Sequence, residues 1–150
     1  MTTHNDLVIR PFTGADTESL SGIWLAASRQ AHPFIGEQTL VAQRHAIEHT
    51  YLPAAQTLVA DSDGTPVGFI SLLGDFVGGL FVAPSFQGQG IGRRLLAHAM
   101  AGRTELMLEV YIENRDALRF YLRQGFREIS RRPVDDSGLP FENARLVWRL

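Results

Sequence analysis

The sequence contains no cysteine. This absence excludes disulfide bonds, thiolate ligands for a metal and a cysteine nucleophile. No stretch approaches the roughly 18 consecutive apolar residues of a membrane-spanning helix, and the polar start lacks the basic-then-apolar layout of a secretory signal. We therefore expect a cytoplasmic protein that has no membrane partner.

The sequence also has little net charge. The formal charge is -2 and the isoelectric point is about 6.2, so the chain lacks the cationic field that phosphate-backbone binding needs. Nucleic acid is therefore not expected as a main partner. The 45% of hydrophobic and 20% of charged residues are typical of a folded protein rather than a disordered one. We interpret residues 1–150 as a single domain with one ordinary core.

Strand-like and helix-like hydrophobic patterns follow one another along the chain. A strand pattern at 7–10 precedes two helical patterns, and the second of these is expected to stop before Pro53. The turn Asp63-Gly64 predicts an antiparallel hairpin. The later patterns are strands at 76–82, 106–111, 126–132 and 144–150 and helices at 91–102 and 114–125. The resulting order, βααβββαβαββ, predicts an α+β fold with a mixed sheet.

A glycine-dense loop joins the strand pattern at 76–82 to the next helix. Its sequence is Gln87-Gly88-Gln89-Gly90-Ile91-Gly92-Arg93. Glycines allow successive backbone N–H groups to converge, and a helix N-terminus adds positive potential, so the loop is typical of an anion cradle. Arg93 stands where GxGxxG needs glycine, and GxxxxGK[ST] is absent. A diphosphate ligand fits this loop, and a ligand-free glycine turn is the alternative.

Three motifs, in order, resemble the GNAT superfamily of acyl-CoA N-acetyltransferases. Gln87, Gly90 and Gly92 match the family's phosphate loop, [Gln/Arg]-x-x-Gly-x-[Gly/Ala]. Leu80–Pro84 is similar to the family's fourth strand and following turn, and Asn114–Phe126 is similar to its "N…A…FY…GF" segment. The resemblance implies a GNAT-like mixed central sheet over nearly the whole chain, with splayed fourth and fifth strands.

The resemblance implies acetyl-CoA as co-substrate and no metal. In the family, the pantetheine arm lies between the splayed strands and hydrogen-bonds the fourth strand like an added strand. Gly78-Gly79 fits either a β-bulge there or a close approach of the ligand. The residues expected to bind the cofactor are Phe81, Val82, Gln87, Gly88, Gln89, Gly90, Ile91, Gly92, Arg93, Asn114, Ala117, Phe120 and Tyr121.

Attack of an amine on a thioester needs two proton transfers. Tyr121 occupies the tyrosine position of the family's FY pair, so the resemblance implies that it is the general acid; packing beside Phe120 is the alternative. An amine with a pKa of about 10.4 needs a base or an ordered water. No acid stands at 80–82, where some relatives carry glutamate, which leaves Glu109, Asp75 and His32 as candidate bases.

The acceptor site is expected where the early helices meet the late polar loop. Its candidate residues are Trp24, His32, Phe34 and Asp135. The resemblance implies that the acceptor is a primary amine: a protein lysine or N-terminus, a polyamine or another small amine. The segment His45–His49 matches an inverted zinc-protease motif, but a third ligand is not evident, so we interpret the match as accidental. Because relatives are commonly dimers, the resemblance also implies a homodimer.

These patterns predict an acetyl-CoA-dependent N-acetyltransferase that works by direct attack in a ternary complex, since no cysteine can carry an acyl group. The alternative is a non-catalytic CoA-binding or acetyl-CoA-binding sensor or interaction module. Tyr121 and Asn114 favour the enzyme, and the missing carboxylate at 80–82 favours the alternative. A nucleotide-binding domain, which would prefer NAD or ATP to CoA, ranks last.

Overall fold

The computed structural model describes residues 7–150, and our interpretation of the polar start at 1–6 lies outside them. Its strands form one seven-stranded sheet in the order β1-β2-β3-β4-β5-β7-β6. Neighbouring strands are antiparallel except β4 and β5, which are parallel. The predicted mixed sheet is therefore confirmed. The strands are β1 (Leu7–Pro11), β2 (Gln56–Ser62), β3 (Thr65–Leu73), β4 (Phe76–Val82), β5 (Glu105–Tyr111), β6 (Arg127–Arg132) and β7 (Asn143–Arg149).

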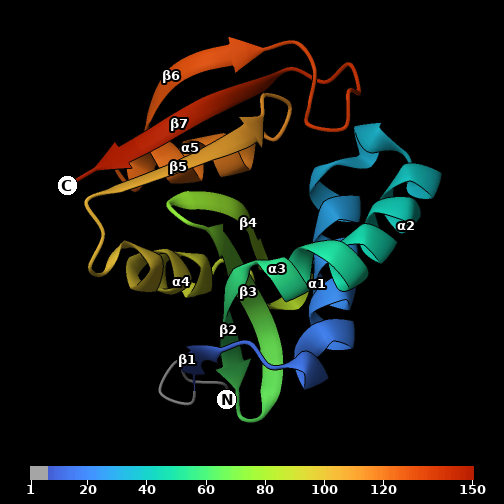
Figure 1. Ribbon diagram of the computed structural model, residues 1–150, viewed down its shortest axis with the longest axis vertical. Coiled ribbons are helices and arrows are strands. Elements are labelled where there is room, and N and C mark those ends of the chain that lie inside the picture. Colours follow the sequence, from blue (N-terminus) through green and yellow to red (C-terminus); the bar gives the residue numbers. More distant parts are fainter. Residues whose placement is uncertain (1–6) are drawn as a thin grey trace.

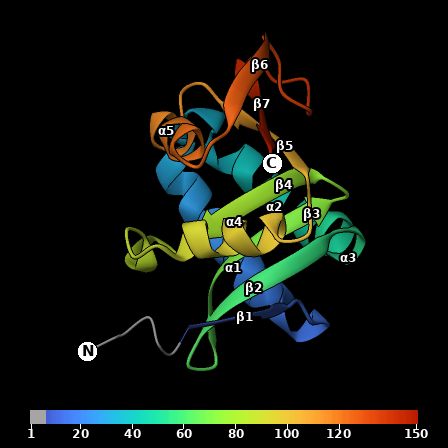
Figure 2. The ribbon, with the colours of Figure 1, turned by 90° about the vertical axis from the view of Figure 1, so that its left-hand side faces the viewer.

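Helices cover both faces of this sheet (Figure 1). α1 and α2 pack on one face through a core that includes Leu20, Leu40 and Phe69, whereas α4 and α5 pack on the other around Leu95 and Leu108. In Figure 2 the group β1 to β4 and the group β5 to β7 occupy different halves of the molecule. The helices are α1 (Thr17–Ala31), α2 (Glu37–Ala46), α3 (Leu52–Ala54), α4 (Ile91–Met100) and α5 (Arg115–Arg123).

The second helical segment extends further than the sequence pattern predicts. After α2 the chain makes a π-helical turn, Ile47–Tyr51, and continues into the short α3. The prediction that Pro53 ends the helix was therefore wrong by one turn. Pro53 lies in α3 directly after the π-helical turn, so the helical segment ends at Ala54, just beyond the proline rather than before it.

The parallel pair β4–β5 is very short. Its register contains only Phe76 opposite Met107 and Val77 opposite Leu108. Beyond these positions β4 continues beside β3 and β5 continues beside β7, so the two strands separate toward their carboxyl ends. The predicted splay of the fourth and fifth strands is confirmed, and it opens a gap at the middle of the sheet.

Candidate active site

A cleft of about 230 Å³ lies between the separating strands. Phe81 and Tyr111 line it on the face covered by α1 and α2, whereas Leu80, Val110 and Tyr121 line it on the face covered by α4 and α5. The lining alternates in this way because successive side chains of a strand point to opposite faces. The lining of the cleft therefore comes from both faces of the sheet.

The glycine-rich loop enters α4 beside this cleft. Gly88 and Gly90 have φ angles of 77° and 81°, a conformation that glycine adopts without strain. The Gln87 side chain donates a hydrogen bond to the Val82 carbonyl (3.1 Å), which ties the loop to the end of β4. Because the first N–H groups of a helix lack intrahelical acceptors, Ile91 and Gly92 at the start of α4 present donors at the positive end of its dipole. The loop has the geometry of a phosphate site.

Tyr121 lies on α5 with only 8% of its surface exposed, and it lines the cleft. Its ring packs edge-on against Phe120 and Phe126 at centroid distances of 5.3 and 5.5 Å. Burial raises the pKa of Tyr121 above that of an ordinary tyrosine, so its hydroxyl group keeps its proton at neutral pH. The Tyr121 ring is thus packed against its neighbours while the residue still lines the cleft, so its hydroxyl group can act as a proton donor there.

His32 and Asn114 form a hydrogen bond across the cleft. Asn114 Nδ2 lies 3.0 Å from His32 Nε2, and Asn114 Oδ1 accepts a hydrogen bond from the Ala117 N–H at the start of α5. With Nε2 as acceptor, the proton is assigned to Nδ1. Burial lowers the pKa of His32 to about 4, so the ring is neutral at physiological pH. Both groups of the Asn114 amide are engaged, so contact with a ligand requires an exchange of partners.

Asp135 organises the long loop between β6 and β7. Its carboxylate accepts hydrogen bonds from the Tyr111 hydroxyl (2.8 Å) and from the N–H groups of Ser137 and Leu139 (both 2.9 Å). Asp135 is buried, although it borders the cleft, whereas its neighbour Asp136 is exposed. Asp136 is therefore the more accessible acid of the pair.

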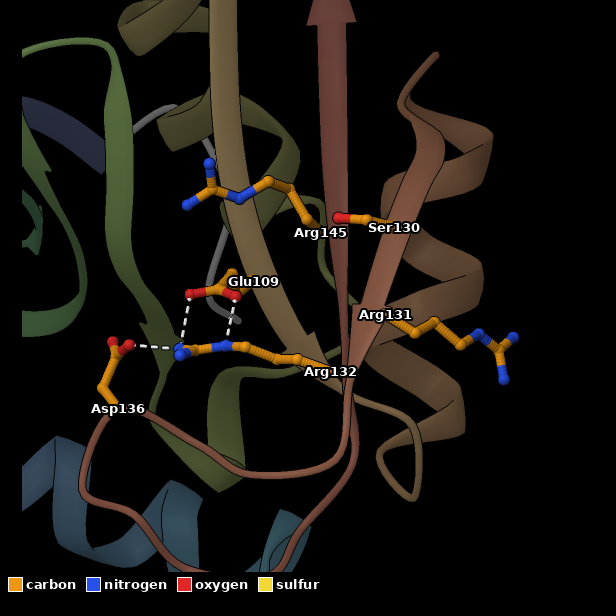
Figure 3. A pocket seen from close by; sticks show the side chains of 6 residues that line it. All are labelled: Glu109, Ser130, Arg131, Arg132, Asp136 and Arg145. Carbon is orange, nitrogen blue, oxygen red and sulfur yellow. Dashed lines mark hydrogen bonds and ion pairs between the residues drawn. The ribbon is translucent and has the colours of Figure 1, made fainter.

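Glu109 lines the cleft from β5 and is held by Arg132 of β6 (Figure 3). Arg132 donates to both carboxylate oxygens of Glu109, at 2.9 and 3.0 Å, and is also hydrogen-bonded to Asp136. Two carboxylates thus share one guanidinium group. Each Glu109 oxygen accepts one hydrogen bond from Arg132 and keeps a second lone pair that can accept another.

The other candidates lie around the cleft rather than in its wall. Trp24 is buried in α1 and packs edge-on against Phe81, with ring centroids 6.5 Å apart. Phe34 contacts the rings of His32 and Tyr111. Asp75 precedes β4 at the closed end of the gap and forms an ion pair with Arg103 (3.4 Å). These three residues can shape the site through their neighbours.

Sequence reasoning missed Tyr51, which ends the π-helical turn. Its hydroxyl group is buried and has no hydrogen-bond partner among the described residues. The β3–β4 register passes from Ser71–Gly79 to Leu72–Val77, so Gly78 is the extra residue of a β-bulge. A Cβ atom at Gly78 would lie 1.2 Å from the Tyr51 hydroxyl oxygen. The paired glycines were the sequence signal for this close approach.

The His45–His49 segment is arranged differently from a metal site. The two imidazole rings lie 4.2 Å apart, but the Glu48 carboxylate accepts a hydrogen bond from Ser21 at 2.7 Å. Within residues 7–150, no three His, Cys, Asp or Glu side chains are grouped so that they could hold a metal ion. In the same range, no helix is long and apolar enough to cross a membrane.

A sheet that opens between two parallel strands, next to a glycine loop and a helix N-terminus, defines an acyltransferase of the N-acetyltransferase class. The sequence pattern of the acetyltransferase (GNAT) domain matches residues 53–128. The chain belongs to this family and is an N-acetyltransferase.

Similar proteins cover almost the whole chain. The peptidyl-lysine N-acetyltransferase YjaB of Salmonella typhimurium is 33% identical over 141 residues, which are 93% of this chain and 97% of that protein. The solution structure of apo-form YjaB from Escherichia coli has a TM-score of 0.86 at 31% identity and covers 95% of this chain and 97% of that one. The PaiA N-acetyltransferase of Thermoplasma acidophilum in complex with coenzyme A has a TM-score of 0.78 at 19% identity, with coverages of 96% and 99%, and shows the same fold.

Proposed function

We propose that the protein transfers an acetyl group from acetyl-CoA to the ε-amino group of a lysine in a protein, by direct attack in a ternary complex. The observation that carries this proposal is the cleft between the separating strands, whose lining comes from both faces of the sheet, because a cofactor and a protein segment would meet there from opposite sides. A relative that is 33% identical is named a peptidyl-lysine N-acetyltransferase, which supports lysine over other amines.

The chain's own residues fit coenzyme A. The N–H groups from Gln87 to Arg93 would hold the pyrophosphate at the positive end of α4. The backbone of Phe81 and Val82, which β5 leaves unpaired, would hold the pantetheine arm as an added strand. Ala117 and Phe120 on α5 would border the arm, and the glycine at position 92 keeps the loop close to Phe120. When bound, acetyl-CoA supplies the activated acetyl group.

Tyr121 is the proposed general acid. A C–N bond forms at the thioester carbon and the C–S bond breaks, so the departing thiolate needs a proton. Tyr121 lines the cleft and keeps its proton because burial raises its pKa, and so it can supply that proton. The amine must lose a proton in the same reaction, which keeps the number of protons balanced.

Glu109 is the proposed base, because it is the acidic residue of β5 that lines the cleft. Its pairing with Arg132 fixes the carboxylate, and a water molecule can relay the proton to a lone pair that Arg132 does not occupy. His32, Trp24, Phe34 and Asp135 shape the acceptor side of the cleft in this proposal.

The test is acetyl-CoA-dependent thiol release with lysine peptides, polyamines and aminoglycosides, beside calorimetry of CoA binding. Release with lysine peptides, together with ε-acetylation detected by mass spectrometry, is the expected result. Release with polyamines alone would replace the proposed acceptor. Binding of CoA without release across the panel would favour the non-catalytic CoA-binding module, and absence of CoA binding would refute the proposed cofactor.

A further inference from the structure

A second cavity of about 310 Å³ lies beside the cleft, on the face of β5, β7 and β6 (Figure 3). Glu109, Arg132 and Asp136 line both hollows, so the second cavity adjoins the proposed acceptor side. Ser130, Arg131 and Arg145 complete its lining. A segment that presents an amine in the cleft would place its neighbouring groups near this cavity.

Strand register brings the polar side chains of this cavity onto one face. Glu109 of β5 stands directly opposite Arg145 of β7, and Arg145 in turn stands opposite Ser130 of β6. Directly opposed residues in antiparallel strands point to the same side of a sheet. Arg145 therefore lies in the wall of the cavity, between Glu109 of β5 and Ser130 of β6.

The charges in the cavity are unequally matched. Arg132 is paired with two carboxylates, those of Glu109 and Asp136. Arg131 forms ion pairs with Glu128 (3.1 Å) and Glu142 (3.9 Å), and Figure 3 shows that its side chain points away from the other residues of the cavity. Among residues 7–150, no carboxylate forms an ion pair with Arg145. The cavity thus contains one cation that forms no ion pair within the described part of the chain, although Glu109 stands opposite it on the neighbouring strand.

Arg145 is also held in place. Its guanidinium carbon lies over the ring of Phe76 at 5.8 Å from the ring centroid, at the start of β4. A cation–π contact of this kind restricts the side chain without neutralising its charge. A planar guanidinium group that is partly buried and not paired is suited to bind a carboxylate through two parallel hydrogen bonds.

We propose that Arg145 binds a carboxylate of the acceptor, so that the substrate class is an amine that carries a carboxylate close by. This inference rests on the proposed function, because it concerns the acceptor of that reaction. The carboxylate can come from an Asp or Glu near the target lysine of a protein, or from the α-carboxylate of a free amino acid. Arg145 determines specificity in either case and takes no part in proton transfer.

The experiment measures thiol release with two lysine peptides that differ only by Glu or Gln next to the lysine, and with free lysine against lysinamide. For the wild-type protein we expect kcat/KM to be about tenfold higher for the Glu peptide, mainly through KM, since tenfold corresponds to one well-placed charged contact. Higher activity with free lysine than with lysinamide, without a Glu-peptide preference, would assign the carboxylate to an amino acid instead.

The matched variants are Arg145→Gln, Arg145→Lys and, as control, Arg131→Gln. Arg145→Gln should abolish the preference, Arg145→Lys should keep part of it because the charge remains, and Arg131→Gln should keep all of it. The preference should also shrink as salt rises. Thermal melting of each variant checks folding, and Arg145→Lys keeps the test valid if the Gln variant does not fold.

Binding separates the two proposals. Calorimetric titration of the Glu and Gln peptides into the CoA-saturated protein measures the contact without turnover. Absence of thiol release from every acceptor would refute the proposed function, while tighter binding of the Glu peptide that is lost in Arg145→Gln would still support the inference. If neither binding nor release distinguishes carboxylate-bearing from neutral acceptors in the wild-type protein, or if Arg145→Gln retains the distinction, the inference is overturned.

Discussion

Replacing Tyr51 with Phe removes a buried hydroxyl group that has no hydrogen-bond partner among the described residues. Burial and the charge of Asp136 raise the pKa of Tyr51, so the group removed is neutral. A buried polar group without a partner costs about 1–3 kcal/mol. We therefore expect Tyr51→Phe to raise the free energy of unfolding by about that amount. For a protein of this size the melting temperature should rise by at least about 2 °C.

Replacing Gly78 with Ala acts on the same contact from the other side. The new Cβ would lie 1.2 Å from the Tyr51 hydroxyl oxygen and 2.5 Å from the ring carbon that carries it, so the ring must move. Overpacking of this kind costs about 1–3 kcal/mol. In a Tyr51→Ala background the obstacle is absent, so Gly78→Ala should cost less there, with a coupling free energy of about 0.5–3 kcal/mol.

Urea unfolding followed by circular dichroism measures the free energy of unfolding of the wild-type protein, Tyr51→Ala, Gly78→Ala and the double variant, which together form a double-mutant cycle. Gly22→Ala is the matched control, because a Cβ there would meet only Arg44 Nη2, at 3.9 Å, and alanine should stabilise α1 by about 0.5–1 kcal/mol. A loss of more than about 1 kcal/mol in Tyr51→Phe would show that the hydroxyl group has a partner, such as an ordered water. An equal cost of Gly78→Ala in both backgrounds would refute the packing argument.

Three further predictions concern the cleft. Tyr121→Phe should lower kcat by about 100-fold or more while calorimetry shows unchanged CoA binding, and near-normal turnover would disprove the acid role. Asn114→Ala removes the cap of α5 and the partner of His32, so chemical denaturation should show a loss of about 1–2 kcal/mol, with Asn114→Asp restoring the cap. Because burial lowers the pKa of His32 to about 4 from the usual 6.5, the unfolded chain binds more protons between these values. The free energy of unfolding should therefore fall as pH drops from 6.5 to 4, by about 3 kcal/mol in all, and an equally steep fall in His32→Asn would contradict this assignment.

Local patterns in the sequence predicted the strand, glycine loop and helix from 76 to 100. This was possible because glycines and the spacing of hydrophobic residues determine the backbone conformation over only a few residues. The sequence alone left open whether Gly78-Gly79 was a bulge or a ligand contact. The structure shows a bulge, and the Tyr51 side chain occupies the space beside Gly78. Tyr51 ends a π-helical turn that no pattern in the sequence predicted.

The charged part of the site was harder to predict for the same reason. Arg132 and Asp136 are only four residues apart, but Glu109 reaches Arg132 because β5 and β6 flank β7, and that pairing is not local in the sequence. The adjacent acids Asp135 and Asp136 carry equal signals in the sequence. Only the hydrogen bonds of the folded loop decide that Asp135 is buried and Asp136 exposed.

Only two register pairs join β4 to β5, at the closed end of the cleft. A small rotation of β4 about this point would therefore move the far end of the strand by a larger distance. From Val77 to Val82 the strand reaches about 16 Å at about 3.3 Å per residue, so a rotation of about 5° at the closed end moves its far end by about 1.4 Å. Displacements of about 1 Å between reacting groups can change a rate by about 100-fold. Side chains packed at this closed end, such as Val77 and Leu108, line the cleft themselves and are thus placed to set the width of the opening.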